Sequence, residues 1–532
     1  MTDEASPVPG EPIKESTKTA ASTAPTARLH TNGSQPTTGT ESNGLVPGAP
    51  AESARIAPLG TGPFGAAAAF GGAAARNESV AALNTATVAA MRRKLVGPNT
   101  AVNYDTPLHI VRGAGAYLYD IDGNKYLDCV NNVAHVGHCH PQVVSAVSKQ
   151  MSILNTNARY LHGNLVSHAE ALAASMPEPL EVTYAVCSGS EANDLAFRIA
   201  RAARPGAEHV AVMGGAYHGH TRLLIDMSPF KYEGPGGEGR KPWVHVLPCP
   251  DPYRGLHMDG KAAARAAIAE AEAEGGRICA FFAESILSCG GQIMPPKGYL
   301  ADVHAAMRAH GAVCVADEVQ CGFGRAGSHF WAFDAQGVVP DIVTLGKSIG
   351  NGFPMGAVVT RREHALAFSN GMEYFATCGG CTAAGAAGLA VMSVVASEGL
   401  QARAADTGDY LMARLRELQK LYPVLGDVRG TGLMVGIEVV DGSMAKHHAP
   451  SVAHWIREAM VARRVLLATD GPYANVLKIK PPMCFGRAES DHLVEQLSQV
   501  LAEGVPEEMA AYDAAWHARG MPKTVKPWLL KL

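Results

Sequence analysis

The sequence contains no uninterrupted apolar run of about 18 residues, the length that a membrane-spanning helix requires, because charge, glycine or histidine breaks its most apolar stretches. It also lacks a strong excess of charge: the formal net charge is −4 and the isoelectric point is about 6.6. Neither nucleic acid nor an anionic membrane is therefore an expected partner. With 532 residues, the chain is long enough for two or three structural units with a sizeable core. A soluble enzyme that acts on small molecules is the expected class.

No paired metal-binding or disulfide pattern is present either. The 11 cysteines are scattered, and several stand in apolar segments such as 311–316, which is typical of reduced, buried thiols. Cys378 and Cys381 form one C-x-x-C without a second pair. We therefore predict a reducing compartment and no metal site.

Residues 1 to about 85 are rich in Ala, Gly, Pro, Ser and Thr and show no helical or alternating apolar period. Such a segment cannot bury enough surface to offset its chain entropy, so we predict a disordered tail. Asp3 and Glu4 precede Glu11 and Glu15 without an apolar core, which argues against a secretory signal and against an Arg-rich transit peptide. A cytoplasmic location is predicted, with the mitochondrion as the alternative.

Helical and strand-like segments alternate beyond the tail. Residues 116–128 predict two short strands around a turn at 122–124. Helices are expected at 261–274 and 299–310, and apolar strands at 280–283, 312–316 and 341–344. This alternation favours a mainly parallel sheet covered by helices.

The region after about residue 393 predicts a smaller α+β domain. A helix is expected at 409–421, strands at 432–440 and 476–479, and a closing helix from Ser490. The predicted units are a tail (1–85), the N-terminal part of a small domain (86–145), a large domain (146–392) and the C-terminal part of the small domain (393–532).

A lysine follows the apolar strand in Asp341-Ile-Val-Thr-Leu-Gly-Lys-Ser-Ile-Gly-Asn-Gly352. Lys347, at the end of that strand, can reach into a cleft, although a surface turn is the alternative. Upstream, a β-branched strand ends in Asp317 and Glu318. A buried Asp317 needs a cationic partner; a protonated pyridine nitrogen would serve, and a strand-end salt bridge is the alternative.

A Gly/Ser turn also opens a helix at Cys187-Ser-Gly-Ser-Glu-Ala-Asn-Asp194. The free backbone N–H groups at such a helix start bind phosphate well, which makes Gly189 and Ser190 candidate phosphate contacts. A simple serine N-cap is the alternative.

These motifs, in this order, resemble the class III aminotransferases, a pyridoxal-phosphate (PLP) family of fold type I, over about residues 105–505. The resemblance implies an α/β fold, with a large domain on a mainly parallel sheet of the seven-stranded type and a smaller α+β domain from both chain ends. It implies pyridoxal 5'-phosphate as cofactor and a homodimer with shared active sites, with a tetramer left open.

Carried over to this sequence, the resemblance implies that Lys347 is the Schiff-base lysine and Asp317 the partner of the pyridine nitrogen. Tyr217 would stack on the cofactor ring, and Thr377 would reach the phosphate of the neighbouring subunit. The other implied cofactor contacts are Ser188, Gly189, Ser190, His218, Glu284, Val319 and Gln320. The His135–His140 stretch corresponds to a Gly-His-x-His-Pro turn of the family rather than to a metal site.

Four segments are more similar to the ethanolamine-phosphate and phosphohydroxylysine phospho-lyases, a branch of this family. They are 131–141, 154–162, 241–255 and 468–485. Aminotransferases of the family tend to carry an arginine three residues before the Pro-Pro pair, where this chain has Lys478. Arginine matches a carboxylate in a bidentate way, whereas lysine is a compact charge that serves a phosphate. Cys378 stands where the branch usually has an aromatic residue.

The resemblance therefore predicts a phospho-lyase that converts a vicinal amino-phosphate, phosphoethanolamine or 5-phosphohydroxylysine, into an aldehyde, ammonia and phosphate. Candidate groups for the substrate phosphate are Asn131, Asn132, Arg159, Lys478 and Lys480. A class III aminotransferase of the alanine–glyoxylate type is the first alternative, and a non-catalytic dimeric subunit is the second.

Overall fold

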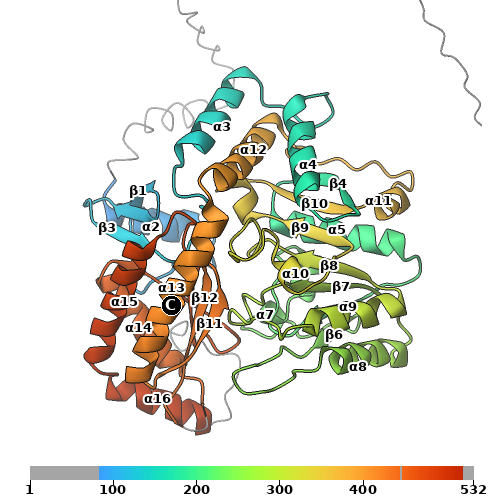
Figure 1. Ribbon diagram of the computed structural model, residues 1–532. Helices are drawn as coiled ribbons and strands as arrows, with labels where there is room; N and C mark the ends of the chain where they lie inside the picture. The colour runs from blue at the N-terminus through green and yellow to red at the C-terminus, as the bar shows by residue number, and fades with distance from the viewer. Residues whose placement is uncertain (1–82, 444–445, 519–532) are drawn as a thin grey trace, which may run out of the picture. The chain divides into compact units, whose positions relative to one another are not determined.

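The computed structural model describes residues 83–443 and 446–518, and all of them belong to one compact unit (Figure 1). The disordered tail was predicted for residues that lie almost wholly outside this range. The tail and the compartment both stay predictions.

The larger sheet has seven strands in the order β4-β10-β9-β8-β7-β5-β6. Their bounds are Leu180–Val186 (β4), Gly356–Arg361 (β10), Ile342–Leu345 (β9), Val313–Asp317 (β8), Ile278–Glu284 (β7), His209–Met213 (β5) and Val244–Leu247 (β6). Strand β10 is antiparallel to both neighbours, and the strands from β9 to β6 pair in parallel. The predicted mainly parallel sheet is confirmed.

Both faces of this sheet are covered, as its sequence requires. All seven residues of β7 are buried, which fits a continuous apolar run better than an alternating one. The helices associated with it are α3 (Pro141–Ile153), α4 (Gly163–Ser175), α5 (Gly189–Ala203), α6 (Arg222–Asp226), α7 (Pro229–Tyr232), α8 (Gly260–Ala273), α9 (Tyr299–His310), α10 (Ala332–Ala335), α11 (Arg362–Phe368) and α12 (Thr382–Ser397). Strands β7, β8 and β9 all end at one edge, at Glu284, Asp317 and Leu345, where ligands of open α/β sheets bind.

Two four-stranded sheets form the smaller part. One joins β1 (Ile110–Ala114), β2 (Tyr117–Asp120) and β3 (Lys125–Asp128) to β13 (Val465–Leu466), which pairs in parallel with β3. The other has the order β11-β12-β15-β14, with bounds Leu425–Thr431, Met434–Val439, Val476–Ile479 and Ala468–Asp470. Its helices are α13 (Leu400–Leu421), α14 (Pro450–Ala462), α15 (Arg487–Ala502) and α16 (Glu507–Ala518). One apolar core combines Ala116 and Leu127 with residues of 391–501, as expected for a small domain built from both ends of the chain.

Some predicted boundaries were wrong. The long helix begins at Leu400 rather than at Asp409, because its first turns carry Ala, Arg and Gln without a clear apolar face. Helix α15 is not the closing helix, since α16 follows it. Helix α2 (Thr85–Leu95) precedes the predicted start of folding; none of its residues is buried, so no apolar period could reveal it.

Within the described ranges, no single helix is long and apolar enough to cross a bilayer. Helices α12 and α13 meet the length and composition criteria only as a pair, bent by 60°.

Candidate active site

Lys347 lies directly after β9, at the start of a short 3-10 turn (Lys347–Gly350). Its φ of 37° is in the left-handed region that non-glycine residues seldom adopt. The backbone around it is tightly packed: a Cβ on Gly346 would lie 2.9 Å from the Cα of Gly189, and a Cβ on Gly189 would lie 2.9 Å from the methyl carbons of Val319. Both glycines are therefore needed where the end of β9 meets the start of α5.

Asp317 ends β8 and is almost fully buried, at 3% exposed. Its Oδ2 accepts hydrogen bonds from Asn193 Nδ2 and pairs with His218 Nδ1, each at 2.8 Å. Asn193 is itself held by Thr344, whose hydroxyl donates to Asn193 Oδ1 at 2.7 Å. Among residues 83–443 and 446–518, no lysine or arginine forms an ion pair with Asp317. A buried carboxylate in this setting fits a cationic ring nitrogen.

Glu284 lies beside Asp317, because the two residues are register partners at the ends of β7 and β8. Its Oε2 accepts a hydrogen bond from the hydroxyl of Ser288, while the buried Oε1 has no hydrogen-bond partner. Burial, together with the charge of Asp317, raises the pKa of Glu284. Two adjacent buried carboxyl groups favour a cation at this point of the site. The protonated ring nitrogen of PLP is such a cation, so the residues present fit this cofactor.

Helix α5 begins at the same edge of the sheet. Ser188 is its N-cap, and Ser188 Oγ accepts from the backbone N–H of Glu191 at 3.1 Å. Ser190 Oγ lies 3.3 Å from His220 Nδ1. The helix start presents backbone N–H groups that suit the cofactor phosphate. Both alternatives raised by the sequence, the N-cap and the phosphate cradle, are thus compatible here.

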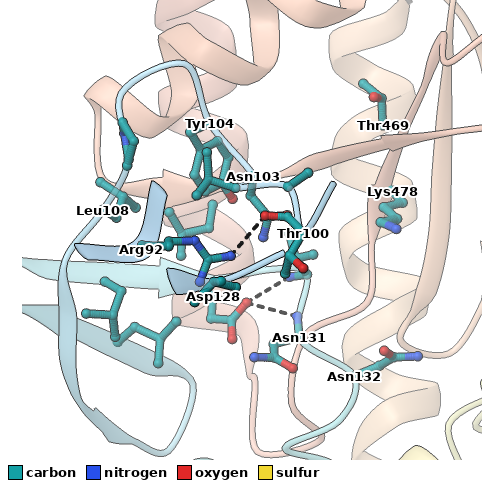
Figure 2. Close-up of a pocket in the computed structure, with 18 of the residues that line it drawn as sticks. Arg92, Thr100, Asn103, Tyr104, Leu108, Asp128, Asn131, Asn132, Thr469 and Lys478 are labelled. Atoms are coloured by element: carbon teal, nitrogen blue, oxygen red, sulfur yellow. Dashed lines mark hydrogen bonds between the residues drawn. The ribbon is translucent and has the colours of Figure 1, made fainter. Parts of the chain in front are cut away.

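A cavity of about 1370 Å³ (Figure 2) has Lys347 in its lining, whereas Asp317, Glu284 and residues 188–190 are not among its lining residues. Six of the residues that line it carry the argument: Lys347, Tyr217, Asn132, Gln320, Lys478 and Lys480. Tyr217 is half-buried, and burial raises the pKa of its phenol. The cavity has ample room for a cofactor and a small substrate together.

Lys478 and Lys480 form a cationic pair in the wall of this cavity. Lys478 Nζ lies 3.2 Å from Asp470 Oδ2, and Lys480 Nζ lies 3.7 Å from the same oxygen. Lys480 also donates to Gln320 Oε1 at 2.8 Å, and Asn132 Nδ2 donates to that oxygen at 3.2 Å. Burial and the neighbouring Lys478 lower the pKa of Lys480. Burial alone would also lower the pKa of Lys478, but the Asp470 carboxylate outweighs it and raises that pKa. Two cations with one carboxylate leave a positive excess that favours an anion.

Arg159, a predicted substrate contact, and Thr377, predicted to act in a neighbouring subunit, lie away from the cavity. Arg159 does not line the cavity; it pairs with Glu373 at 2.9 Å and lies over the ring of Phe375, 4.0 Å from its centroid. Thr377 is exposed and does not line the cavity either. Both assignments stay predictions, and for Thr377 the prediction concerns a neighbouring subunit.

The histidines of the 135–140 stretch have separate protein partners. His135 Nε2 donates to Phe323 O at 2.8 Å, His138 pairs with Asp128 at 2.7 Å, and His140 pairs with Glu398 at 2.9 Å. These contacts fit a structural turn, as the family resemblance implied.

Sequence reasoning missed three polar residues of the site: Asn193, Ser288 and Asp470. Asn193 had a usable signal, because it stands among apolar residues on the buried face of α5. Ser288 and Asp470 had no usable signal in the sequence. Ser288 follows a strand and Asp470 lies in a short one, and each reaches the site only through long-range packing.

The fold and these groups define a fold-type-I PLP enzyme. A family model described as aminotransferase class-III matches residues 99–501. The chain belongs to the class III aminotransferase family, which is PLP-dependent.

Individual relatives carry two kinds of name. An "alanine--glyoxylate aminotransferase 2-like" protein of Drosophila melanogaster is 46% identical over 439 residues, covering 80% of this chain and 89% of the relative. "Ethanolamine-phosphate phospho-lyase homolog 1" of Caenorhabditis elegans is 40% identical over 433 residues, covering 77% and 92%. The structure of a phospholyase from Arthrobacter in complex with phosphoethanolamine matches with a TM-score of 0.75 and 37% identity, covering 79% of this chain and 100% of that one.

Proposed function

We propose that this protein is a PLP-dependent phospho-lyase that acts on a vicinal amino-phosphate, phosphoethanolamine or 5-phosphohydroxylysine. The observation that carries the proposal is the Lys478–Lys480 pair, which lines the same cavity as Lys347 and has an excess of positive charge. The similarity to a phospholyase studied with phosphoethanolamine supports the same assignment.

The proposed reaction uses each group according to its position. PLP, when bound, supplies an electron sink for the pair left after proton removal from the amine-bearing carbon. Lys347 is the base that removes this proton, and Asp317 keeps the ring nitrogen protonated. Lys478 and Lys480 bind the substrate phosphate and stabilise its charge as the adjacent C–O bond breaks. Water then completes the balance: one amino-phosphate and one water give one aldehyde, one ammonia and one inorganic phosphate.

An aminotransferase is the second candidate, because the Drosophila relative at 46% identity carries that name. Both reactions begin with the same proton removal by Lys347, so the groups around the cofactor do not separate them. Lys478 can also bind a carboxylate, although less specifically than arginine does.

Phosphate and ammonia release separates the two. The purified PLP-loaded enzyme is mixed with phosphoethanolamine or with 5-phosphohydroxylysine in the absence of any keto acid, and Lys347→Ala serves as the inactive control. We expect equal amounts of phosphate and ammonia from at least one of these amines. Conversion of the cofactor to its pyridoxamine form by L-alanine, with no phosphate released from either amine, would establish the aminotransferase instead. No visible absorbance from lysine-bound PLP after reconstitution would contradict both.

We further propose a homodimer. Large apolar side chains are exposed on α3, α4 and the segment between them, with exposed fractions of 70% for Ile153, 103% for Leu161 and 64% for Val166. Several large apolar side chains exposed within one short stretch of the chain are typical of a protein interface. Arg159 belongs to the same segment, which supports the idea that the predicted dimer brings it and Thr377 to a shared site.

A further inference from the structure

A strained turn borders the cavity. Residues 288–292 follow β7, Cys289 lines the cavity, and Ser288 Oγ accepts from Gln320 Nε2 at 2.7 Å. Gly291 has a φ of 113° and Gln292 a φ of 56°. A buried glutamine in the left-handed region is unfavourable, and such a conformation persists only when its surroundings hold it.

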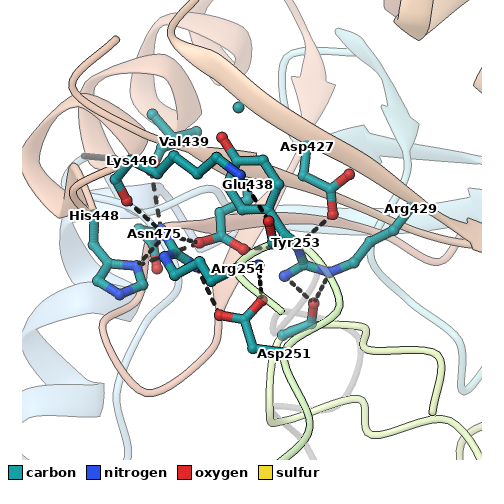
Figure 3. Close-up of polar contacts among 12 residues, drawn as sticks. Asp251, Tyr253, Arg254, Asp427, Arg429, Glu438, Val439, Lys446, His448 and Asn475 are labelled. Atoms are coloured by element: carbon teal, nitrogen blue, oxygen red, sulfur yellow. Dashed lines mark hydrogen bonds and ion pairs between the residues drawn. The ribbon is translucent and has the colours of Figure 1, made fainter. Parts of the chain in front are cut away.

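Besides the turn's own backbone hydrogen bonds, Arg429 of β11 contacts it from the small domain; Figure 3 shows Arg429 among its acidic partners. Its Nε and Nη2 both donate to the carbonyl oxygen of Gly291, at 3.0 and 2.8 Å. Its Nη1 donates to Asp427 Oδ2 at 2.9 Å and to Glu438 Oε2 at 2.6 Å. The guanidinium thus links the carboxylates of the small domain to a carbonyl group beside the cavity.

Glu438 fixes Arg429 in this orientation. It is 4% exposed and lies 2.6 Å from Arg254 Nη2 and 3.3 Å from His448 Nδ1 (Figure 3). Burial alone would raise the pKa of Glu438, but His448, Arg429 and Arg254 together hold it well below its usual range. The carboxylate is therefore charged at neutral pH, where it can pair with both arginines.

The held turn reaches the cationic pair through Asp470. Gln292 Nε2 donates to Asp470 Oδ2 at 3.1 Å, and the backbone N–H of Gly471 donates to Cys289 O at 3.1 Å. Asp470 Oδ2 is the oxygen that pairs with Lys478. A chain of contacts thus runs from Arg429 through Gly291 and Gln292 to Asp470 and the lysines.

We propose that Arg429 is a positioning residue for the substrate anion. By clamping the carbonyl of Gly291, it keeps Gln292 on Asp470 and so keeps Lys478 in place at the cavity wall. This rests on the proposed function, in which Lys478 binds the substrate phosphate. Arg429 itself does not line the cavity.

Arg429→Lys tests the clamp, because lysine keeps the positive charge beside Asp427 and Glu438 but cannot match the planar fork of two N–H groups aimed at one carbonyl. Arg487→Lys is the matched control: Arg487 forms an exposed ion pair with Asp406 away from the cavity. Both variants are made in the PLP-loaded enzyme, alone and combined with Lys478→Met. For each we measure KM and kcat for phosphoethanolamine, the affinity for inorganic phosphate, and hydrogen–deuterium exchange of residues 285–293.

For Arg429→Lys we expect KM to rise about tenfold with kcat within about threefold, faster exchange in 285–293, and unchanged cofactor absorbance. Because the effect passes through Lys478, adding Arg429→Lys to Lys478→Met should change KM no further. Additive effects in the double variant, or unchanged KM and phosphate affinity despite faster exchange, would overturn the positioning role.

Failure of the proposed function is visible separately, in the unmodified enzyme. If that enzyme releases no phosphate but transaminates L-alanine, the same set of variants is measured with L-alanine, whose carboxylate then takes the place of the phosphate at Lys478. The double-variant comparison decides the positioning role in either case.

Discussion

Lys478 Nζ and Asp470 Oδ2 lie 3.2 Å apart on neighbouring strands of the small domain, where β14 and β15 pair. Lys480 shares the same carboxylate oxygen at 3.7 Å. The register places Asp470 opposite Val476. Because side chains alternate along a strand, Lys478 of β15 and Lys480, which directly follows the strand, share a face with Asp470. Two lysine cations and one carboxylate leave a net charge of +1 at this point, which attracts a phosphate dianion.

Replacing Lys478 by alanine should therefore weaken substrate binding. We expect KM for phosphoethanolamine to rise by about 10- to 100-fold, because a charge-assisted contact to phosphate is lost. Lys420→Ala is the control, since Lys420 forms an exposed pair with Glu417. Steady-state kinetics measure both. An unchanged KM in Lys478→Ala would remove Lys478 from the substrate site.

Asp317→Asn should lower kcat strongly while changing the stability of the folded protein little. The amide keeps the side-chain shape and an oxygen acceptor for His218 or Asn193, but it cannot neutralise a ring cation. We expect kcat to fall by about 10²- to 10³-fold, the scale typical of losing one preorganised electrostatic group, together with weaker PLP retention. Asp302→Asn, on the exposed face of α9, is the control. Activity near that of the control would contradict the assignment of Asp317.

Those site groups that follow strands of the large sheet could be found from the sequence. Asp317 and Lys347 each come directly after a continuous apolar run, and parallel strands deliver their carboxyl ends to one edge. Gly189 and Ser190 could be predicted for a similar reason, because a Gly/Ser turn preceded an amphipathic helix. Local pattern and sheet geometry indicated these positions, whereas their roles came from the family resemblance and stay predictions.

Other parts of the site depend on contacts that no local pattern encodes. Asp470 approaches Lys478 through sheet register in the small domain, and Gln292 reaches Asp470 through a left-handed turn that Arg429 holds. Helix α2 contributes to the cavity wall yet buries no residue, so hydrophobic periodicity could not find it. The Gln292–Asp470 and Arg429–Gly291 contacts arise from tertiary packing, since they join residues 178 and 138 positions apart.

Glu438 should give the protein a distinct acid dependence of stability. Its folded-state pKa lies below its ordinary value of 4.5, so the stability it contributes is full above about pH 4.5 and is lost as the pH falls below that value. At neutral pH, Glu438→Gln should lower the free energy of unfolding by about 3–5 kcal/mol, because Arg429 and Arg254 lose a buried partner.

Denaturant unfolding at a fixed protein concentration, from neutral pH down to about pH 3.5, tests this dependence. The difference in the free energy of unfolding between the unmodified protein and Glu438→Gln should become smaller as the pH falls. Glu417→Gln, in an exposed pair with Lys420, should show little difference at any pH. A gap that stays constant across the acid range would mean that Glu438 is not the group responsible.

The exposed apolar surface of α3 and α4 should mediate dimer formation. Leu161 is fully exposed in the single chain, at 103%, and Ile153 and Tyr160 are exposed at 70% and 68%. Such side chains gain free energy only when a partner covers them, by about 25 cal/mol for each Å² buried.

Leu161→Asp places an unpaired charge in that contact and should shift the protein toward monomer, as measured by sedimentation or light scattering across a concentration series. Leu421→Asp is the matched control, because Leu421 is exposed at 72% but lies at the end of α13, in the small domain. If the site is shared between subunits, the Leu161→Asp variant should also lose activity in proportion to its monomer fraction. A fully active monomer would show that one chain is sufficient for activity. A dimer unaffected by Leu161→Asp would place the interface elsewhere.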